Sequence, residues 1–170
     1  MERTLVVIKP DGVEKKLIGE IIKRYESAGF RIKALKMIDP KKFKEQVEKH
    51  YSMDDTEYLE SLGKKGEKAG EKVENYLEYG KQVVAWLRDY LAKGPIVPMI
   101  IEGPNVISKI RGITGYTDPS AAEKGTIRGD FGDDSILKAN SEKRANYNLV
   151  HASGNPEEAE REIALWFPNI

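Results

Sequence analysis

The sequence predicts an α+β fold, the ferredoxin-like βαββαβ (split βαβ) arrangement, with an antiparallel sheet, added helices and a C-terminal helix. Short β-branched runs alternate along the chain with longer segments whose apolar residues recur at helical spacing. The predicted order is strand, helix, strand, helices, strand, helix, strand, helix, which becomes βαββαβ once the extra helices are set aside. At 170 residues the chain fits one domain with one sizeable core. We therefore predict a single domain over residues 1–170.

The N-terminal part begins with a buried strand and a helix. Residues 4–8 (TLVVI) are apolar and β-branched, and the turn sequence KPDG ends this strand just as it delivers Lys9. The next stretch, LIGEIIKRYESAGF, carries apolar residues at helical spacing and closes with Gly29, which is typical of the residue just beyond a helix end. A second strand is predicted over residues 30–38.

A second helix is predicted to start at Asp39-Pro40, because an N-cap residue followed by proline favours a helix start. Its apolar stripe places His50 and Tyr51 at the end of this helix. Residues 52–72 are rich in Lys, Glu, Asp and Gly and carry few apolar anchors. We expect them to form a solvated, mobile insertion with at most a short helix.

The C-terminal half continues the alternation. The predicted elements are a helix over 73–92, a strand over 96–101, a helix over 105–113 and a short strand over 148–151. A long loop with several glycines is expected over 114–135, and the stretch near 132–147 is long and polar. The last helix has Asn155 as N-cap, Pro156 at its first position and Glu158 at the capping-box position.

Composition excludes several classes of protein. Lys plus Arg and Asp plus Glu number 28 each, so the net charge is zero and no surface is built to hold nucleic acid or anionic lipid by bulk attraction. The absence of cysteine excludes disulfides, thiolate metal sites and a cysteine nucleophile. The N-terminal apolar run is too short for a signal peptide, and no segment reaches membrane-spanning length. We expect a cytoplasmic protein with no nucleic-acid or membrane partner.

His151 is the first candidate for chemistry. A single histidine beside apolar residues is more often structural than catalytic, but its neighbours favour a role. Asn148 and Ser153 offer hydrogen-bonding groups on either side, and Glu162 lies on the last helix, where its carboxylate could reach back and orient the ring. In the predicted fold the first and last strands can be neighbours, so Lys9 and His151 could line one site. An oriented histidine is a candidate nucleophile or base.

Several other side chains form a donor set suited to a polyphosphate. Lys9 leaves a buried strand, Arg111 follows an apolar helical turn, and Arg128 lies between glycines in GTIRGDF. Taken singly, each is more often a solvated or surface charge. Together with Thr117 and Asn148 they match phosphate oxygens, because arginine forks bind them in pairs and lysine acts as a point charge. No GxxxxGK[ST] loop or GxGxxG turn is present, so a nucleotide would be held by side chains.

The motifs that contain these residues resemble nucleoside diphosphate kinases. They are VIKPDGV (7–13), HY (50–51), EGPNVISKIRGITGYTDP (102–119), GTIRGDF (125–131) and NLVHAS (148–153), followed by AEREIALWF. They cover both ends of the chain and most of its middle. The resemblance implies an enzyme that moves a phosphoryl group from a nucleoside triphosphate, mainly ATP, to a histidine and then to a nucleoside diphosphate, in a ping-pong reaction.

The resemblance also implies a role for each matched residue. His151 would be phosphorylated, and Glu162, Ser153 and Tyr51 would support it. Phosphates and ribose would be held by Lys9, Arg111, Thr117, Arg128 and Asn148. Mg²⁺ would be carried by the nucleotide phosphates without a cage of protein ligands. The protein would be a homo-oligomer, either a hexamer or a tetramer.

The sequence departs from the family pattern in three places. The connection from Tyr51 to Gly94 is much longer than in many members, with a probable insertion near 52–72, and the stretch near 132–147 is also extended. The nearest aromatic residue for stacking the base is Tyr58. Gly154 stands where many relatives carry an acidic residue, which puts a water-mediated metal contact in doubt.

Two alternative functions fit parts of the sequence. One is a catalytically weak, nucleotide-binding regulatory protein of the same fold, in which the insertions cover or distort the site. The complete residue set argues against it. The other is an RNA-binding module of the RRM type, which needs aromatic stacking platforms and a basic face. The strand over 30–38 carries one aromatic residue and the net charge is zero, so this alternative is disfavoured.

Overall fold

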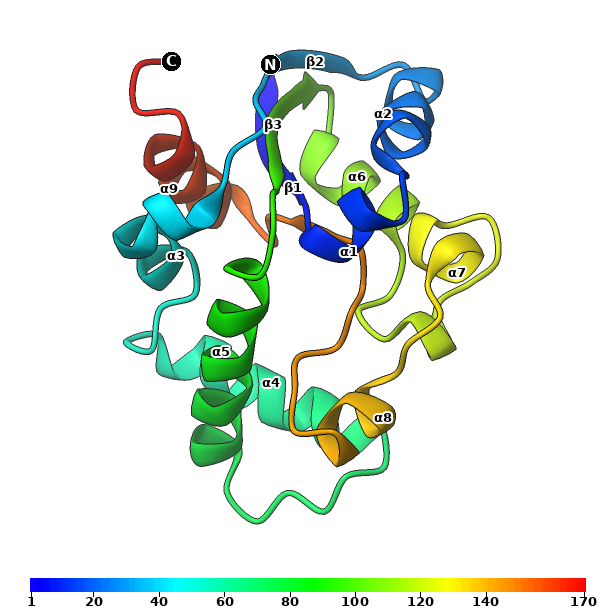
Figure 1. Cartoon of the computed structure of the whole chain (residues 1–170). Coiled ribbons are helices and arrows are strands. Elements are labelled where there is room, and N and C mark those ends of the chain that lie inside the picture. The colour runs from blue at the N-terminus through cyan, green and yellow to red at the C-terminus, as the bar shows by residue number, and fades with distance from the viewer.

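The computed structural model describes all 170 residues, arranged about a four-stranded antiparallel sheet (Figure 1). The strands are β1 (Glu2–Ile8), β2 (Arg31–Leu35), β3 (Val97–Gly103) and β4 (Val150–Ala152). Their order across the sheet is β2-β3-β1-β4, and every neighbouring pair is antiparallel. This is the strand order of the ferredoxin-like arrangement, so the predicted fold class is confirmed. No helix is long and apolar enough to cross a membrane.

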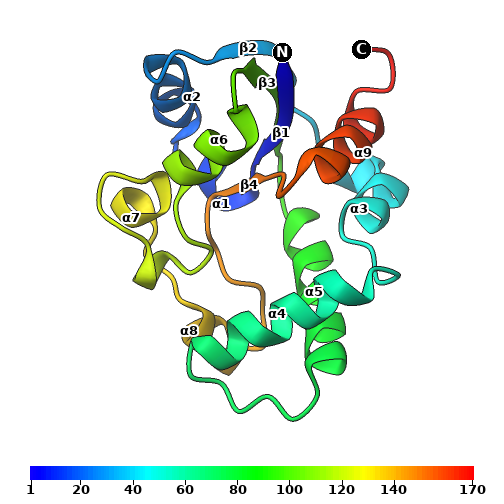
Figure 2. The ribbon, with the colours of Figure 1, turned by 180° about the vertical axis from the view of Figure 1, so that it is seen from behind.

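Helices cover both faces of the sheet and extend below it (Figures 1 and 2). They are α1 (Pro10–Glu14), α2 (Ile18–Ser27), α3 (Lys44–His50), α4 (Thr56–Lys68), α5 (Tyr76–Leu91), α6 (Val106–Thr114), α7 (Ile127–Phe131), α8 (Ile136–Ser141) and α9 (Pro156–Trp166), with 3₁₀ turns at Pro40–Lys42 and Pro119–Ala121. Helices α2 and α6 lie on one side of the sheet and α3 and α9 on the other.

The central strand β1 divides the apolar interior into two cores. Because successive side chains of a strand point to opposite faces, Val6 and Ile8 enter the core under α2 and α6. Leu5 and Val7 enter the second core, under α3, α5 and α9. All four side chains are fully buried, so β1 is fixed from both sides.

Pairing of β4 with β1 brings the two ends of the predicted site together. Val7 lies opposite His151 in the sheet, and the main-chain N–H of Lys9 donates to the carbonyl of Leu149 at 2.8 Å. The prediction that Lys9 and His151 lie at neighbouring strand ends is confirmed. The KPDG turn is more than a turn, since Lys9 is the N-cap of α1 and Pro10 is its first residue.

Two predicted elements are shorter than expected. The second strand ends at Leu35, and beyond it only Ile38 bridges to the residue before β3. The helix predicted from Asp39 begins as a 3₁₀ turn, because the Asp39 carboxylate accepts the N–H of Lys41 at 3.1 Å and tightens the start. Regular α-helix resumes only at Lys44.

The largest correction concerns residues 52–72, which were predicted as a solvated insertion that could contain a short helix. They contain the 13-residue helix α4, capped by Asp55, whose carboxylate accepts the N–H of Tyr58 at 2.9 Å. Few apolar side chains are needed because α4 meets α5 backbone to backbone. A Cβ on Gly80 would lie 2.2 Å from the carbonyl oxygen of Leu59, and one on Gly63 would lie 2.6 Å from the Cα of Tyr76. Glycine at these positions therefore permits the crossing seen in Figure 2.

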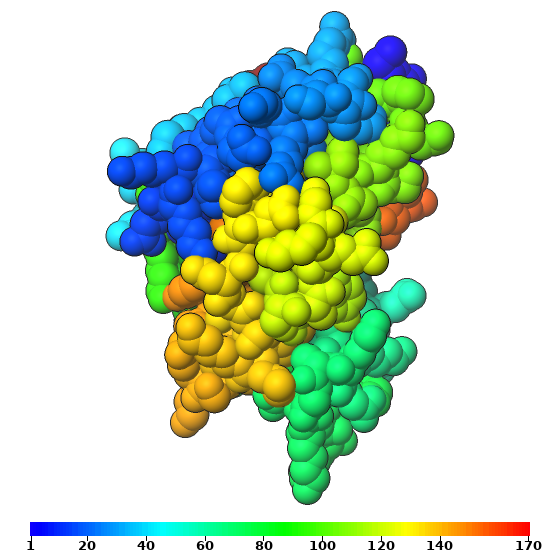
Figure 3. Space-filling view, turned by 90° about the vertical axis from the view of Figure 1, so that its right-hand side faces the viewer, coloured from blue at the N-terminus to red at the C-terminus, as the bar shows by residue number.

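The segments expected as loop also contain helices. Residues 114–135 include a 3₁₀ turn and α7, and residues 132–147 include α8. Buried Asp134 fixes the second segment by accepting two hydrogen bonds from Arg144, at 2.6 and 3.0 Å, and one from the N–H of Tyr147 at 2.8 Å. This yellow-to-orange segment packs between the blue N-terminal part and the teal α4 in Figure 3.

Candidate active site

His151 lies in β4 with one ring nitrogen held and the other free. Its Nε2 is 2.9 Å from a carboxylate oxygen of Glu162, and the hydroxyl of Ser153 donates to the same oxygen at 2.7 Å. Glu162 and Ser153 are fully buried. The Nδ1 atom of His151 makes no hydrogen bond within the protein. If Nε2 carries the proton that Glu162 accepts, the lone pair lies on Nδ1 and is available for attack.

Glu162 is placed by α9, whose start is well defined. The Asn155 side chain accepts the N–H of Glu158 at 2.8 Å, so the predicted N-cap is confirmed. The carboxylate of Glu158 accepts the N–H of Gly154 at 2.6 Å, one residue before the position a capping box would use. The helix start therefore fixes the turn between His151 and α9.

His50 is a neighbour of His151 that the sequence reasoning did not name as a site residue. Their rings meet edge to face with centroids 4.5 Å apart, and the Nδ1 of His50 is 3.5 Å from Glu162. The indole N–H of Trp166 donates to the same Nδ1 at 3.2 Å. The signal that could have found it is its place beside Tyr51 in the HY motif. His50 therefore packs directly against the ring of His151 and lies beside the same carboxylate.

Burial keeps both imidazoles neutral. It lowers the pKa of His151 to about 3, and the charges of Lys9 and Arg128 act in the same direction while Glu158 opposes them. Burial likewise lowers the pKa of His50 to about 3. The pKa of the Glu162 carboxyl is raised by burial. A neutral His151 at physiological pH retains the lone pair that a nucleophile needs.

Lys9, Asn148 and Thr117 form a chain of hydrogen bonds beside His151. The ammonium of Lys9 donates to the Asn148 side-chain oxygen at 2.8 Å, and the Asn148 amide donates to the carbonyl of Thr117 at 2.9 Å. The Thr117 hydroxyl makes no hydrogen bond of its own. Burial, followed by the charge of Arg128, lowers the pKa of Lys9 to about 7. The binding of an anion beside it would raise this pKa and favour the charged form.

The two arginines differ in their surroundings. Arg128 is buried and donates to the carbonyls of Asn148 at 3.0 Å, Gly115 at 2.9 Å and Val150. Burial lowers its pKa to about 10, so it stays charged. Arg111 is exposed, forms no salt bridge, and its guanidinium lies 3.5 Å from where a Cβ on Gly154 would be. Arg128 therefore ties main chain together as well as offering donors, whereas Arg111 is free to bind a ligand.

Two tyrosines complete the predicted set. Tyr51 is buried, with its ring centroid 6.3 Å from that of His151 and its hydroxyl without a hydrogen-bond partner. Burial raises its pKa well above the usual value. Tyr58 is half-buried on α4, packs against the second core and lines the same pocket as His151. The structure thus places both tyrosines beside the pocket, one behind the histidine and one on the facing helix.

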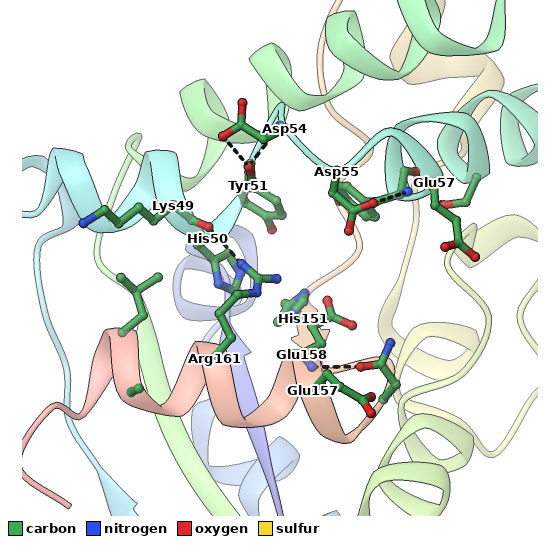
Figure 4. Close-up of a pocket in the computed structure, with 16 residues that line it drawn as sticks. Lys49, His50, Tyr51, Asp54, Asp55, Glu57, His151, Glu157, Glu158 and Arg161 are labelled. Carbon is green, nitrogen blue, oxygen red and sulfur yellow. Dashed lines mark hydrogen bonds between the residues drawn. The ribbon is translucent and has the colours of Figure 1, made fainter.

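A pocket of about 1000 Å³ opens beside His151, between α3, the start of α4 and α9 (Figure 4). Its acidic residues are Asp54, Asp55, Glu57, Glu157 and Glu158. Lys9, Arg111 and Arg128 are not among the residues that line it. Lys49 and Arg161 also line the pocket, so its acidic residues outnumber its basic ones by five to two. The phosphates of a ligand are therefore better suited to the side of His151 that carries Lys9, Arg111 and Arg128.

The metal-binding capacity of the site is limited. One group of three potential ligands occurs, His50, His151 and Glu162, whose ligand atoms lie within 4.8 Å of one another. Mg²⁺ prefers several oxygen ligands and retained water, which two imidazoles and one engaged carboxylate do not supply. Nearer the basic residues, the carboxylate of Glu158 lies 2.6 Å from where a Cβ on Gly154 would be. A carboxylate from α9 thus occupies the space that a side chain at residue 154 would fill.

Comparison with known proteins gives a consistent match. The family model described as nucleoside diphosphate kinase matches residues 2–68 and 64–170. A nucleoside diphosphate kinase from Pyrobaculum aerophilum is 41% identical over 98% of this chain and 95% of its own length, and one from Caldanaerobacter subterraneus is 40% identical over 100% and 96%.

Solved structures agree. The crystal structure of an NDP kinase from Pyrobaculum aerophilum superposes with a TM-score of 0.90, at 40% identity, over 98% of this chain and 95% of the other. A transition-state mimic of the nucleoside diphosphate kinase from Borrelia burgdorferi, with bound vanadate and ADP, superposes with a TM-score of 0.83 at 32% identity, over 99% and 88%.

We expect neither histidine to titrate between about pH 8 and about pH 5, where an exposed imidazole with a pKa of about 6.5 gains its proton. Burial lowers both pKa values to about 3. Between about pH 6.5 and about pH 3 the unfolded chain then binds more protons than the folded protein, so these two groups reduce stability as the pH falls. Ring ¹H–¹⁵N spectra at stepped pH check this. A midpoint near 6.5 for either ring would show that burial does not control it.

Proposed function

The chain belongs to the nucleoside diphosphate kinase family and is a phosphotransferase, and we propose that its reaction is a ping-pong transfer in which His151 carries the phosphoryl group. One observation carries this assignment. The imidazole of His151 is neutral, its Nε2 is hydrogen-bonded to Glu162, and its Nδ1 makes no hydrogen bond. The hydrogen bonds that join His151, the Glu162 carboxylate and the Ser153 hydroxyl support this assignment. Little rearrangement is then needed before attack.

In the proposed first step the Nδ1 lone pair attacks the γ-phosphorus of a nucleoside triphosphate, mainly ATP. An N–P bond forms, the bond to the bridging oxygen breaks, and the nucleoside diphosphate leaves. In the second step an oxygen of another diphosphate attacks the phosphorus and the N–P bond breaks. Positive charge develops on the ring in the first step. The Glu162 carboxylate, which accepts a hydrogen bond from Nε2 with an N···O distance of 2.9 Å, stabilises this charge.

The basic residues have the charge that phosphoryl transfer requires. Lys9, Arg111 and Arg128 would neutralise the oxygens of the transferring group, where the transition state gains most of its stabilisation. Thr117 and Asn148 would hold phosphate and ribose, and Ser153 and Tyr51 would support His151 and its carboxylate. Tyr58 is the aromatic residue of α4 that lines the pocket with His151, and we assign it the base.

Mg²⁺ fits this site as an ion carried by the nucleotide. When bound to the phosphates it neutralises charge and orients the group that is transferred. The one cluster of potential ligands, His50, His151 and Glu162, is rich in nitrogen and poorly suited to Mg²⁺. The Glu158 carboxylate accepts the N–H of Gly154, close to where the guanidinium of Arg111 lies, and is the candidate for a contact through water.

The regulatory alternative gains no support from any feature of the site. The insertion at 52–72 folds as α4 across from His151 and leaves Nδ1 without a covering hydrogen bond. A homo-oligomer, hexamer or tetramer, is retained as a proposal and is supported by the exposed Leu35 and Met37 at the open edge of the sheet. A cytoplasmic location stays a prediction.

Incubation with γ-labelled ATP tests the proposed function. The wild-type protein should acquire an acid-labile, base-stable label, because a phosphoryl group on histidine nitrogen hydrolyses in acid, and should pass it to added GDP. His151→Ala should acquire no label and lose turnover. Far-ultraviolet circular dichroism of the variant serves as the control for folding. Label that persists in His151→Ala, or that maps to His50, would show that the nucleophile is misassigned.

The two arginines should respond differently to substitution. Arg111→Ala should lower kcat/KM through a loss of about 2–4 kcal/mol of transition-state stabilisation, with an unchanged Tm, because Arg111 is exposed and unpaired. Arg128→Ala should lower both kcat/KM and Tm, because three carbonyls lose their donor.

Steady-state kinetics and melting curves measure both effects, with the exposed Arg3→Ala on β1 as a control of equal charge change. A loss below about tenfold in kcat/KM for both arginine variants corresponds to less than about 1.4 kcal/mol of transition-state stabilisation. Such a result would show that neither arginine contributes to phosphoryl transfer.

A further inference from the structure

We propose that Lys65 of α4 is a fourth phosphate-binding cation, which contacts the nucleotide phosphates that are not transferred. This inference rests on the proposed function. The matched motifs do not include this residue, since Lys65 lies in the segment between HY and the strand before EGPNV. The segment that carries Lys65 was expected to be solvated. In the structure this segment forms α4, which brings Lys65 toward the phosphate-binding residues.

Three residues of α4 form one stripe that faces the site. Tyr58, Ser61 and Lys65 are spaced at i, i+3 and i+7, so they lie on one side of the helix. Tyr58 and Ser61 line the pocket together with His151. Lys65 continues the stripe roughly 10 Å beyond Tyr58 at 1.5 Å per residue. A nucleotide whose base stacks on Tyr58 could therefore extend its phosphates along the same helix.

Contacts along the C-terminal half of α4 hold this helix against α5 and against the loop before Thr117. The helix cannot rotate freely, because Gly63 and Gly66 face Tyr76 and Tyr79 of α5 at distances that leave no room for a Cβ. Near its C-terminal end the ammonium of Lys68 lies 5.0 Å from the ring centroid of Tyr116, the residue before Thr117. The half of α4 that holds Lys65 is thus next to the loop that carries a predicted phosphate ligand.

Lys65 and the nearby cations lack direct acidic partners, which favours the binding of an anion among them. Lys65 is half-buried and forms neither a salt bridge nor a side-chain hydrogen bond. Lys9, Arg111 and Arg128 likewise have no carboxylate within salt-bridge distance. Equal numbers of acidic and basic residues would allow each cation a direct partner, yet none of these four has one, and Asp11 and Glu158 act on them only from beyond salt-bridge distance. Like charges that influence one another without direct partners are stabilised when a polyanion binds between them.

The position of Lys65 on α4 places it toward the phosphate-binding loop. Lys65 is not among the residues that line the pocket with His151, and it lies one turn before Lys68, which contacts the Tyr116 ring. Burial, then the charges of Arg111 and Arg128, lower the pKa of the Lys65 ammonium, while Glu158 opposes them. A cation in this position is suited to the phosphates that stay on the nucleoside.

Steady-state kinetics of Lys65→Gln tests the proposal. Contacts to groups that do not change in the reaction contribute equally to ground and transition states, so KM should rise while kcat changes little. We expect KM for ADP and GDP to rise about tenfold or more, as for a lost charge-assisted hydrogen bond. Lys65→Arg should restore most of the affinity, because it keeps the charge.

Lys64→Gln is the matched control, since Lys64 is the preceding residue of the same helix and is exposed. It removes the same charge from α4 and should change KM by less than about twofold. Equal KM values for Lys65→Gln and Lys64→Gln, or a fall in kcat alone, would overturn the role of Lys65. Labelling of His151 in the wild-type protein is scored separately. Its absence would refute the proposed function, whereas normal labelling with an unaffected Lys65→Gln refutes only this inference.

Discussion

The hydrogen bond between Nε2 of His151 and the buried carboxylate of Glu162 is the constraint on which the site depends. A carboxylate in an apolar interior is costly unless its oxygens are engaged. Here one oxygen is shared by His151 and Ser153, while the other has no hydrogen-bond partner and lies 3.5 Å from Nδ1 of His50. The bond joins β4 to α9, two elements separated by the short turn at Gly154. It also decides which ring nitrogen faces the ligand. Loss of either partner would leave a buried polar group unsatisfied and the imidazole free to rotate.

Pairing within the sheet fixes the position of β4 and therefore of His151. Because β4 pairs with β1, His151 lies beside the strand end that delivers Lys9, and Arg128 ties the main chain of β4 to the loop at Gly115. His151 and Glu162 thus lie on a strand and a helix that pack against the two cores, and sites built on such elements hold their geometry more accurately than sites on loops. Helix α4 lines the pocket on another side, although this segment lies outside the motifs that identify the family.

The sequence was sufficient for the fold class and for the pairing of His151 with Glu162, because apolar periodicity and helix capping are local signals. It was insufficient where the contacts are nonlocal. Helix α4 was missed because Gly63 and Gly80 supply close backbone contact in place of apolar side chains. The three carbonyls held by Arg128 could not be read from its place in GTIRGDF, since they come from distant segments. For the same reason Lys65 gave no signal until α4 was placed beside the arginines.

The most direct measurement is the identity of the ring nitrogen of His151 that carries the phosphoryl group. Protein labelled with ¹⁵N-histidine can be phosphorylated with ATP and examined by NMR for phosphorus–nitrogen coupling. The geometry predicts a phosphoryl group on Nδ1, with Nε2 still protonated and bonded to Glu162. A phosphoryl group on Nε2 would contradict the account, because Glu162 would then have to release the nitrogen that it holds.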